Sequence, residues 1–149
     1  MSVDLSVLDT VPVLASLGTD DKQALAGIVV RDHLDAGTVL FEEGQPAEEV
    51  FFLLEGAVEL SVELKGRGDQ TVLRLGPGEV VGWAGMMPYE RIATARVTEK
   101  ASVLRMEGWA LGELCEKDHD VGFAVMKILA TELGKRLRDV LLGMKDAAG

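Results

Sequence analysis

The sequence predicts a mainly β domain, a β-sandwich or β-roll with flanking helices, followed by one long helix. Two observations lead to this fold class. Between residues 30 and 107, apolar or alternating runs are separated by turn residues about every ten positions, as in all-β folds. From Gly108 onwards, apolar residues recur every three or four positions, which is the period of a helix.

The N-terminal part is predicted to be helical. Residues 5–17 combine apolar positions with a proline, and we expect a short helical segment that packs on the domain. Thr19 or Asp20 is expected to cap a helix over residues 21–29, because both side chains can accept a hydrogen bond from a free backbone amide.

The central part is predicted to form antiparallel strands. Residues 57–65 alternate apolar and polar side chains, the pattern of a strand with one buried face. Gly56 is expected to interrupt the buried run before it, and residues 66–69 to form a hairpin turn with positive φ angles. The predicted strands are residues 30–34, 38–42, 49–55, 57–65, 70–75, 93–98 and 101–106.

Two helices are predicted after the strands, over residues 109–117 and 121–144, with Asp118 or Asp120 as cap of the second. The second helix carries an apolar stripe longer than a small roll can cover. We therefore expect a homodimer through this helix. The alternative is that the helix only covers the roll of its own chain. The residues expected at the dimer contact are Val125, Ile128, Leu129, Leu133, Leu137, Val140 and Leu141.

Composition limits the possible functions. The chain has 149 residues, which we expect to form one domain over 1–149, with the roll at about 30–107 and the C-terminal helices at about 108–145. The net charge of −10 disfavours nucleic acid and anionic membranes as partners. The single cysteine, Cys115, permits no disulfide within the chain.

No constellation of residues points to catalysis or to a bound metal. His33 and His119 are far apart in the sequence and form no metal-binding pair. Ser61 and Ser102 lie in strand-like segments without the glycine-flanked turn of a nucleophilic serine. We therefore expect a protein that is no enzyme and carries no cofactor.

The segment from residue 75 to 97 is the strongest candidate for a functional site. Gly76-Pro77-Gly78 and Gly82 surround a short apolar run, a loop over 83–90 follows, and Arg91 precedes a strand. Glycines let backbone amides approach a ligand, and a guanidinium adds a charged fork, so together they can bind an anion. The alternative is that Arg91 pairs with Glu90 or with another carboxylate.

Two motifs in this segment, Val81-Gly82-Trp83-Ala84-Gly85-Met86 and Arg91-Ile92-Ala93-Thr94-Ala95, resemble the phosphate-binding cassette of cyclic-nucleotide-binding domains. Such domains occur in the bacterial catabolite-activator family and in regulatory subunits of cyclic-nucleotide-dependent kinases. Gly44, Gly56 and Gly78 also fit the family pattern, and the resemblance covers roughly residues 10–142. It implies a β-roll of the jelly-roll or double-stranded β-helix type with a long C-terminal dimerisation helix.

The resemblance also implies a ligand site, in which Arg91 would hold a cyclic phosphate with help from nearby amides. Trp83 stands where ligand-binding members carry a glutamate for the ribose 2′-hydroxyl, and Ile92 replaces a small residue. Trp83 would therefore either fill the ribose position or stack on a different ligand. The expected ligand-binding residues are Gly82, Trp83, Ala84, Gly85, Met86, Arg91, Ile92, Ala93 and Thr94.

These departures lead us to expect a regulatory module with weak or altered cyclic-nucleotide binding. A ligand-free dimerising interaction module and a sensor of a different small anion remain the alternatives. Residues 1–4 provide no basic start and no apolar run, and no apolar stretch of the sequence reaches spanning length, so we expect a cytoplasmic protein. The family's transcription factors continue into a helix-turn-helix domain. Nothing in this sequence supplies such a domain.

Overall fold

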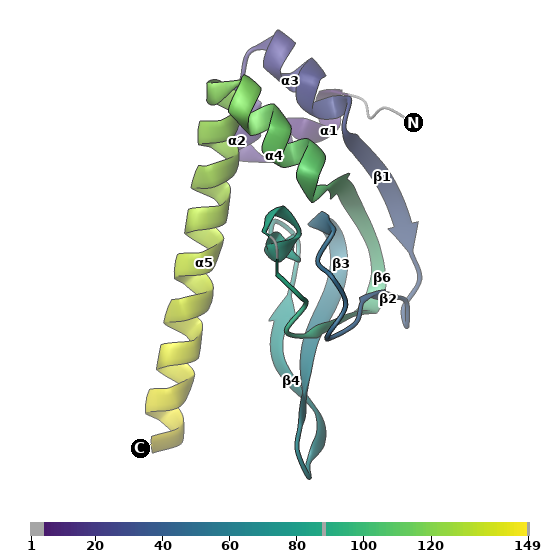
Figure 1. The fold of residues 1–149 in the computed structure, drawn as a ribbon, viewed down its shortest axis with the longest axis vertical. Coiled ribbons are helices and arrows are strands. Elements are labelled where there is room, and N and C mark those ends of the chain that lie inside the picture. The colour runs from purple at the N-terminus through teal and green to yellow at the C-terminus, as the bar shows by residue number, and fades with distance from the viewer. Residues whose placement is uncertain (1–4, 88, 149) are drawn as a thin grey trace.

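The computed structural model describes residues 5–87 and 89–148. Residues 1–4, Pro88 and Gly149 lie outside this description. The prediction made for residues 1–4 and one position of the predicted 83–90 loop therefore lie outside the described residues. A curved antiparallel sheet forms the body of the molecule, the shorter helices gather at one end of it, and a long helix, α5 (His119–Ala148), runs from that end alongside the sheet (Figure 1). The predicted fold class is confirmed.

The sheet is antiparallel at every pairing, in the order β1-β6-β3-β4, with β2 added on β6 and β5 added on β3. Its two long strands, β3 and β6, pair along most of their length and form the frame on which the short strands sit. The strands are β1 (Val29–Leu34), β2 (Val39–Phe41), β3 (Glu49–Leu64), β4 (Gly68–Leu75), β5 (Val80–Val81) and β6 (Thr94–Glu107).

Gly56 does not end its strand, contrary to the prediction. It has a φ angle of 92°, and a Cβ atom there would lie 2.4 Å from the carbonyl oxygen of Lys100. The register between β3 and β6 shifts on both sides of this position, so the glycine bends one continuous strand around its neighbour. Strand β6 is likewise continuous where two strands were predicted.

The N-terminal helices are α1 (Leu5–Leu8), α2 (Pro12–Ala15) and α3 (Thr19–Ala26). The predicted cap at Thr19 or Asp20 is wrong, because Thr19 already has helical geometry and Gly18 takes the cap position without a side-chain hydrogen bond. Helix α3 also ends earlier than predicted, since Val29 already pairs with Met106 as the first residue of β1.

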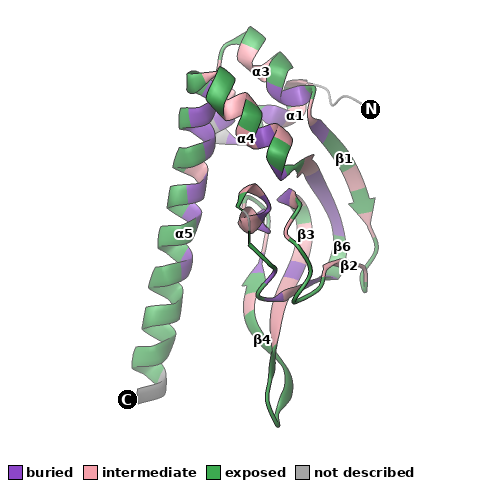
Figure 2. Ribbon diagram, in the orientation of Figure 1, coloured by how far each residue is buried: buried purple, intermediate pink, exposed green. Residues whose placement is uncertain are grey.

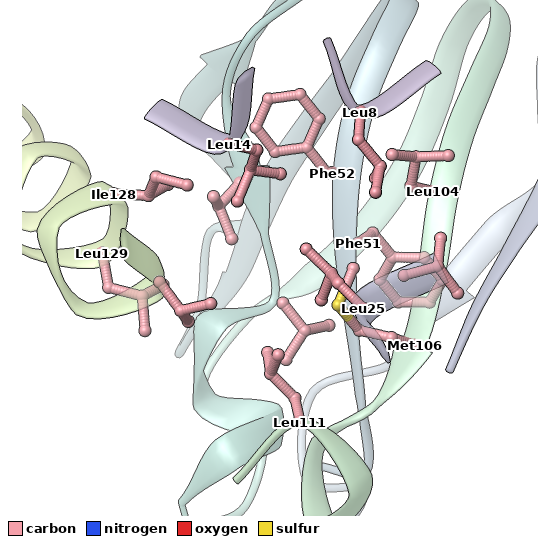
Figure 3. A pocket seen from close by; sticks show the side chains of 14 residues that line it. Leu8, Leu14, Leu25, Phe51, Phe52, Leu104, Met106, Leu111, Ile128 and Leu129 are labelled. Carbon is pink, nitrogen blue, oxygen red and sulfur yellow. The ribbon is translucent and has the colours of Figure 1, made fainter. Parts of the chain in front are cut away.

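The buried apolar side chains form two clusters. One lies inside the roll around Leu53, Val58 and Val97. The other joins the helices to the sheet, and the side chains of Leu8, Phe52 and other residues meet there (Figure 3). A gap of about 50 Å³ within this second cluster is lined by apolar side chains wherever its wall is described, so we expect it to hold no water.

The C-terminal helices are α4 (Gly108–Lys117) and α5 (His119–Ala148). The Asp118 carboxylate accepts hydrogen bonds from the backbone amides of Asp120 and Val121, at 3.1 Å and 3.2 Å, which confirms Asp118 as the predicted cap. Among the described residues, no helix is both long and apolar enough to cross a membrane.

Helix α5 has two different halves, which Figure 2 shows by colour. Its first half packs on the body of the molecule, and the last buried position is Arg136. Residues 137–146 are all exposed. Val125 and Leu129, which were expected at a dimer contact, belong to the core of their own chain, and Ile128 packs partly against it. Of the predicted contact residues, Leu133, Leu137, Val140 and Leu141 are exposed.

Candidate functional site

A cavity of about 260 Å³ lies between the cassette segment, the outer strands of the roll and helix α5. We call it the cassette cavity. Most of its lining residues are apolar, and two arginines, Arg91 and Arg136, are among them. The lining residues are Phe41, Leu60, Val62, Val72, Leu73, Gly82, Trp83, Ala84, Tyr89, Glu90, Arg91, Ile92, Ala93 and Arg136.

Arg91 is held in place by backbone on both sides of the cassette. Its own amide donates to the carbonyl oxygen of Gln45 at 2.7 Å, and its carbonyl accepts from the amide of Gly44 at 2.8 Å. The side chain is only 5% exposed. Its Nη1 donates to the carbonyl oxygen of Gly82 at 3.0 Å and its Nη2 to that of Glu49 at 2.5 Å. The guanidinium therefore ties the cassette to strand β3.

Gly82 makes room for this arginine. Its φ angle is 76°, in the left-handed region, and it precedes the short 3-10 helix η1 (Trp83–Met86). A Cβ atom at this position would lie 2.7 Å from Nη1 of Arg91 and 2.9 Å from the ring of Phe41. The glycine predicted to open the loop for a ligand thus opens it for the guanidinium.

The positive charge of Arg91 has no counter-ion in the described part of the chain. No carboxylate there lies within ion-pair distance of it, and its Nε–H has no acceptor. The alternative that Arg91 pairs with Glu90 is therefore wrong. Burial lowers the pKa of Arg91, and the charges of Glu49 and Glu48 oppose this shift.

Helix α5 reaches the same cavity through Arg136, which is 9% exposed. This side chain donates to the carbonyl oxygen of Val80, two residues before Gly82, and lies 3.6 Å from the Glu132 carboxylate. The neighbouring Lys135 forms an ion pair with Glu79 at 2.8 Å. The helix is therefore attached to strand β5, directly ahead of the cassette.

Comparisons with known proteins show the family to which the chain belongs. A family model described as cyclic nucleotide-binding domain matches residues 31–118, which is more than half of the chain. The chain belongs to the cyclic nucleotide-binding domain family. Its relatives include cyclic nucleotide-gated ion channel 18 of Arabidopsis thaliana, which is 31% identical over 116 residues, 72% of this chain and 16% of the channel.

Transcriptional activator protein anr of Pseudomonas aeruginosa is 30% identical over 135 residues, which are 89% of this chain and 55% of the activator. The chain thus spans about half of that relative and a smaller part of the channel. A solved structure from Geobacter metallireducens, provisionally assigned as a cyclic nucleotide-binding protein, shares 28% identity and a TM-score of 0.77, covering 91% of this chain and 98% of that one.

The catabolite activator protein of Thermus thermophilus has the same fold, with 24% identity and a TM-score of 0.70, over 92% of this chain and 63% of that one. In a cyclic nucleotide-binding domain the cassette is the segment expected to contact the ligand. Of the nine predicted ligand-binding residues, the structure brings Gly82, Trp83, Ala84, Arg91, Ile92 and Ala93 together at the cassette cavity. Ile92 is 81% exposed and lies at its edge.

The other three predicted residues do not line the cassette cavity. Gly85 packs against strand β3, because a Cβ atom there would lie 2.4 Å from the carbonyl oxygen of Glu49. Met86 lines a separate hollow beside Trp109. The Thr94 hydroxyl oxygen accepts a hydrogen bond from the amide of Glu43 at 3.0 Å, which fixes the turn before β3.

Sequence reasoning missed Arg136 and the apolar wall that strands β3 and β4 supply. Arg136 stands seven positions after Leu129 and Glu132 seven after Val125, so both continue the inward face of α5. From this spacing, a charged pair on the buried side of the helix could have been predicted. The wall residues alternate along their strands, but the pattern does not say which face would border a cavity.

Two further groups of titratable side chains do not line the cassette cavity. Asp21, Asp118 and Asp120 bring their carboxylates together where α3 meets the start of α5. Cys115 is half-buried, and burial raises the pKa of its thiol, as expected of a small apolar residue in a core.

Proposed function

We propose that this chain is a non-enzymatic ligand-sensing domain, in which a small anion binds in the cassette cavity at Arg91 and changes the attachment of helix α5. The observation that carries the proposal is the buried guanidinium without a counter-ion. Membership of the cyclic nucleotide-binding domain family supports it, as does the name of the related nucleotide-gated channel.

A buried charge is costly unless it is paired, and the partners of the Arg91 guanidinium among the described residues are carbonyl oxygens and the Phe41 ring. An anion in the cavity would supply the missing counter-charge and an acceptor for further N–H groups. Bidentate contact between a guanidinium and an anion is among the strong hydrogen-bonding arrangements in proteins. Arg91 is therefore the group that we propose to bind the ligand.

Ordinary cyclic nucleotides are proposed to bind weakly. Trp83 lines the cavity where the resemblance places a glutamate for the ribose 2′-hydroxyl. Losing a charged hydrogen bond costs about 1.5–3 kcal/mol, which is roughly a ten- to hundred-fold loss in affinity. The variant Trp83→Glu is expected to strengthen binding of cyclic AMP, and Trp109→Glu, at an exposed tryptophan, is the matched control. An unchanged affinity in Trp83→Glu would contradict this role of Trp83.

The ligand signal would pass through strand β5. The Glu79 side chain accepts from the Gly76 amide at 2.6 Å and pairs with Lys135, and Val80 accepts from Arg136. Burial would raise the pKa of Glu79, but the hydrogen bonds from Lys135 and from the Gly76 amide outweigh it and lower the pKa. A ligand that moves Gly82 would strain these contacts, since Gly82 follows β5 directly.

Calorimetric titration with cyclic AMP and cyclic GMP tests the proposal. We expect weak, saturable binding that is lost in Arg91→Ala and kept in Arg96→Ala, because Arg96 is exposed on the outside of β6. Circular dichroism would check that both variants are folded. If neither a nucleotide nor another small anion binds in an Arg91-dependent way, the proposed function is wrong.

A second candidate function, compatible with the first, is dimerisation through α5. The observation that favours it is the row of exposed apolar side chains after the helix leaves the roll, where Leu137 is 61% exposed. Leu133, Val140 and Met144 continue this row at helical spacing. Because the row could pack against the same row of a second copy, we propose a pair of α5 helices.

A further inference from the structure

We infer that the ligand of the cassette cavity is a small carboxylate with an apolar body, not a nucleotide. This inference rests on the proposed function and names the ligand class of the same site. It follows from three properties of the cavity: the side chains in its wall, its volume, and the kind of charge that it contains.

The wall of the cavity offers few groups that could recognise sugar hydroxyls or base edges. None of the described residues that line it is a serine, threonine, asparagine or glutamine, and the polar ones among them are Tyr89, Glu90, Arg91 and Arg136. Tyr89 and Glu90 are exposed, so two guanidinium groups are the buried polar side chains. A buried hydroxyl without a partner lowers affinity by about ten-fold. A nucleotide would bring several such groups.

The apolar part of the wall fits a flat or branched hydrocarbon body. Leu60, Val62 and Leu73 border the cavity from strands β3 and β4, and Trp83 borders it from the cassette. A tryptophan ring can stack on an aromatic ligand. The volume of about 260 Å³ lies below the range of roughly 300–1,000 Å³ that is usual for sites of drug-sized ligands. The cavity therefore favours a small body over a purine riboside.

The charges at the cavity match one anionic group. Arg136 already faces Glu132, whereas Arg91 has no carboxylate partner among the described residues. Both terminal nitrogens of Arg91 already donate to backbone carbonyls. The N–H groups that remain suit an anionic group with two free oxygens, which a carboxylate and a cyclic phosphodiester both offer, so the apolar wall decides between these two classes.

A single-tryptophan form of the full chain provides the test. The sequence contains two tryptophans, and Trp109 is 69% exposed, so Trp109→Phe leaves Trp83 as the only reporter in the cavity. The probes are benzoate, its neutral isostere benzamide, acetate, and cyclic AMP. Comparing benzoate with benzamide leaves every side chain of the site in place, so it does not depend on how well a variant folds.

We expect a saturable change of Trp83 fluorescence with benzoate, and affinities for benzamide, acetate and cyclic AMP that are each at least about ten-fold weaker. Arg91→Lys should lose most of the benzoate affinity, because an ammonium cannot form the planar fork. Equal binding of acetate, equal binding of benzamide, or tighter Arg91-dependent binding of cyclic AMP would overturn this ligand class and leave the proposed function standing. Binding of none of these anions would overturn both.

Discussion

The guanidinium of Arg91 lies over the ring of Phe41, with its central carbon 3.9 Å from the ring centroid. Phe41 ends strand β2 and is stacked on Phe51, with 6.4 Å between the ring centroids. The ring face attracts the cation and replaces part of its lost hydration. A strand end that is distant in the sequence thus helps to keep a charged side chain buried beside the cassette.

Replacing Phe41 by leucine is expected to lower the free energy of unfolding by about 1–2 kcal/mol, because the cation loses its aromatic partner and some packing is lost. Urea denaturation of the variant would measure this. Phe41→Tyr keeps the ring face and should cost less. Equal losses in the two variants would show that the ring face does not stabilise Arg91.

Gly82→Ala is expected to lower the free energy of unfolding more than an ordinary glycine substitution does. The left-handed backbone at this position costs a residue with a Cβ roughly 1–2 kcal/mol, and the added atom would displace Arg91 or Phe41. We expect a loss of at least about 2 kcal/mol in unfolding free energy together with loss of ligand binding.

The control for this variant is Gly76→Ala, where an added Cβ would meet no atom within 4 Å. Its stability should stay within about 0.5 kcal/mol of the parent. Similar stabilities of the two alanine variants would contradict the tight contact between Gly82 and Arg91.

The stability of the protein should depend on pH through Asp21. The hydrogen bond to Asp118, burial, and the charges of Asp118, Asp120 and Asp20 raise the pKa of Asp21 from 3.8 to about 6. A raised folded-state pKa means that the folded chain binds an extra proton below about pH 6, and the resulting stabilisation disappears as the pH rises through that value.

Asp21→Asn removes this titration and the charge repulsion. Its melting temperature, compared with that of the parent, should improve progressively between about pH 4 and pH 7 and then level off. Thermal unfolding at a series of pH values would measure the difference. A constant difference over this range would contradict the raised pKa.

The proposed dimer predicts that Leu137→Glu produces a monomer, because a charge would be buried between the two helices. Sedimentation velocity would report the mass. Thr131→Glu introduces the same charge on an exposed position of another face of α5 and should leave the dimer intact. A parent chain that sediments as a monomer, or a Leu137→Glu variant that remains a dimer, would rule out this interface.

Much of the fold could be predicted from the sequence, because hydrophobic period and turn residues act locally. The alternation in residues 57–65 and the three-to-four spacing after Gly108 correspond to β3 and to the helices. The role of Gly56 could not be predicted in this way, since its close approach to Lys100 depends on how two long strands wrap around each other. A glycine in a strand is compatible with an end, a bend or a bulge.

The candidate site was predictable to a smaller extent. The cassette motif located Arg91 and Gly82, but their mutual contact needs the fold of the loop between them. The division of α5 into a docked and a free half was also not predictable, because the apolar stripe runs through both. Where the helix leaves the roll depends on the attachment of Arg136 to strand β5, which is a tertiary contact.

The most direct measurement follows the side-chain Nε–H signal of Arg91 in a ¹H–¹⁵N NMR spectrum while an anion is added. Its assignment comes from the signal that Arg91→Lys removes. This N–H has no acceptor in the described part of the chain, so binding of an anion at Arg91 should move it strongly. We predict a saturable shift with benzoate and with weakly binding cyclic AMP at high concentration. If benzoate or cyclic AMP binds to the protein but the Arg91 Nε–H signal does not move, Arg91 is not the ligand-binding group.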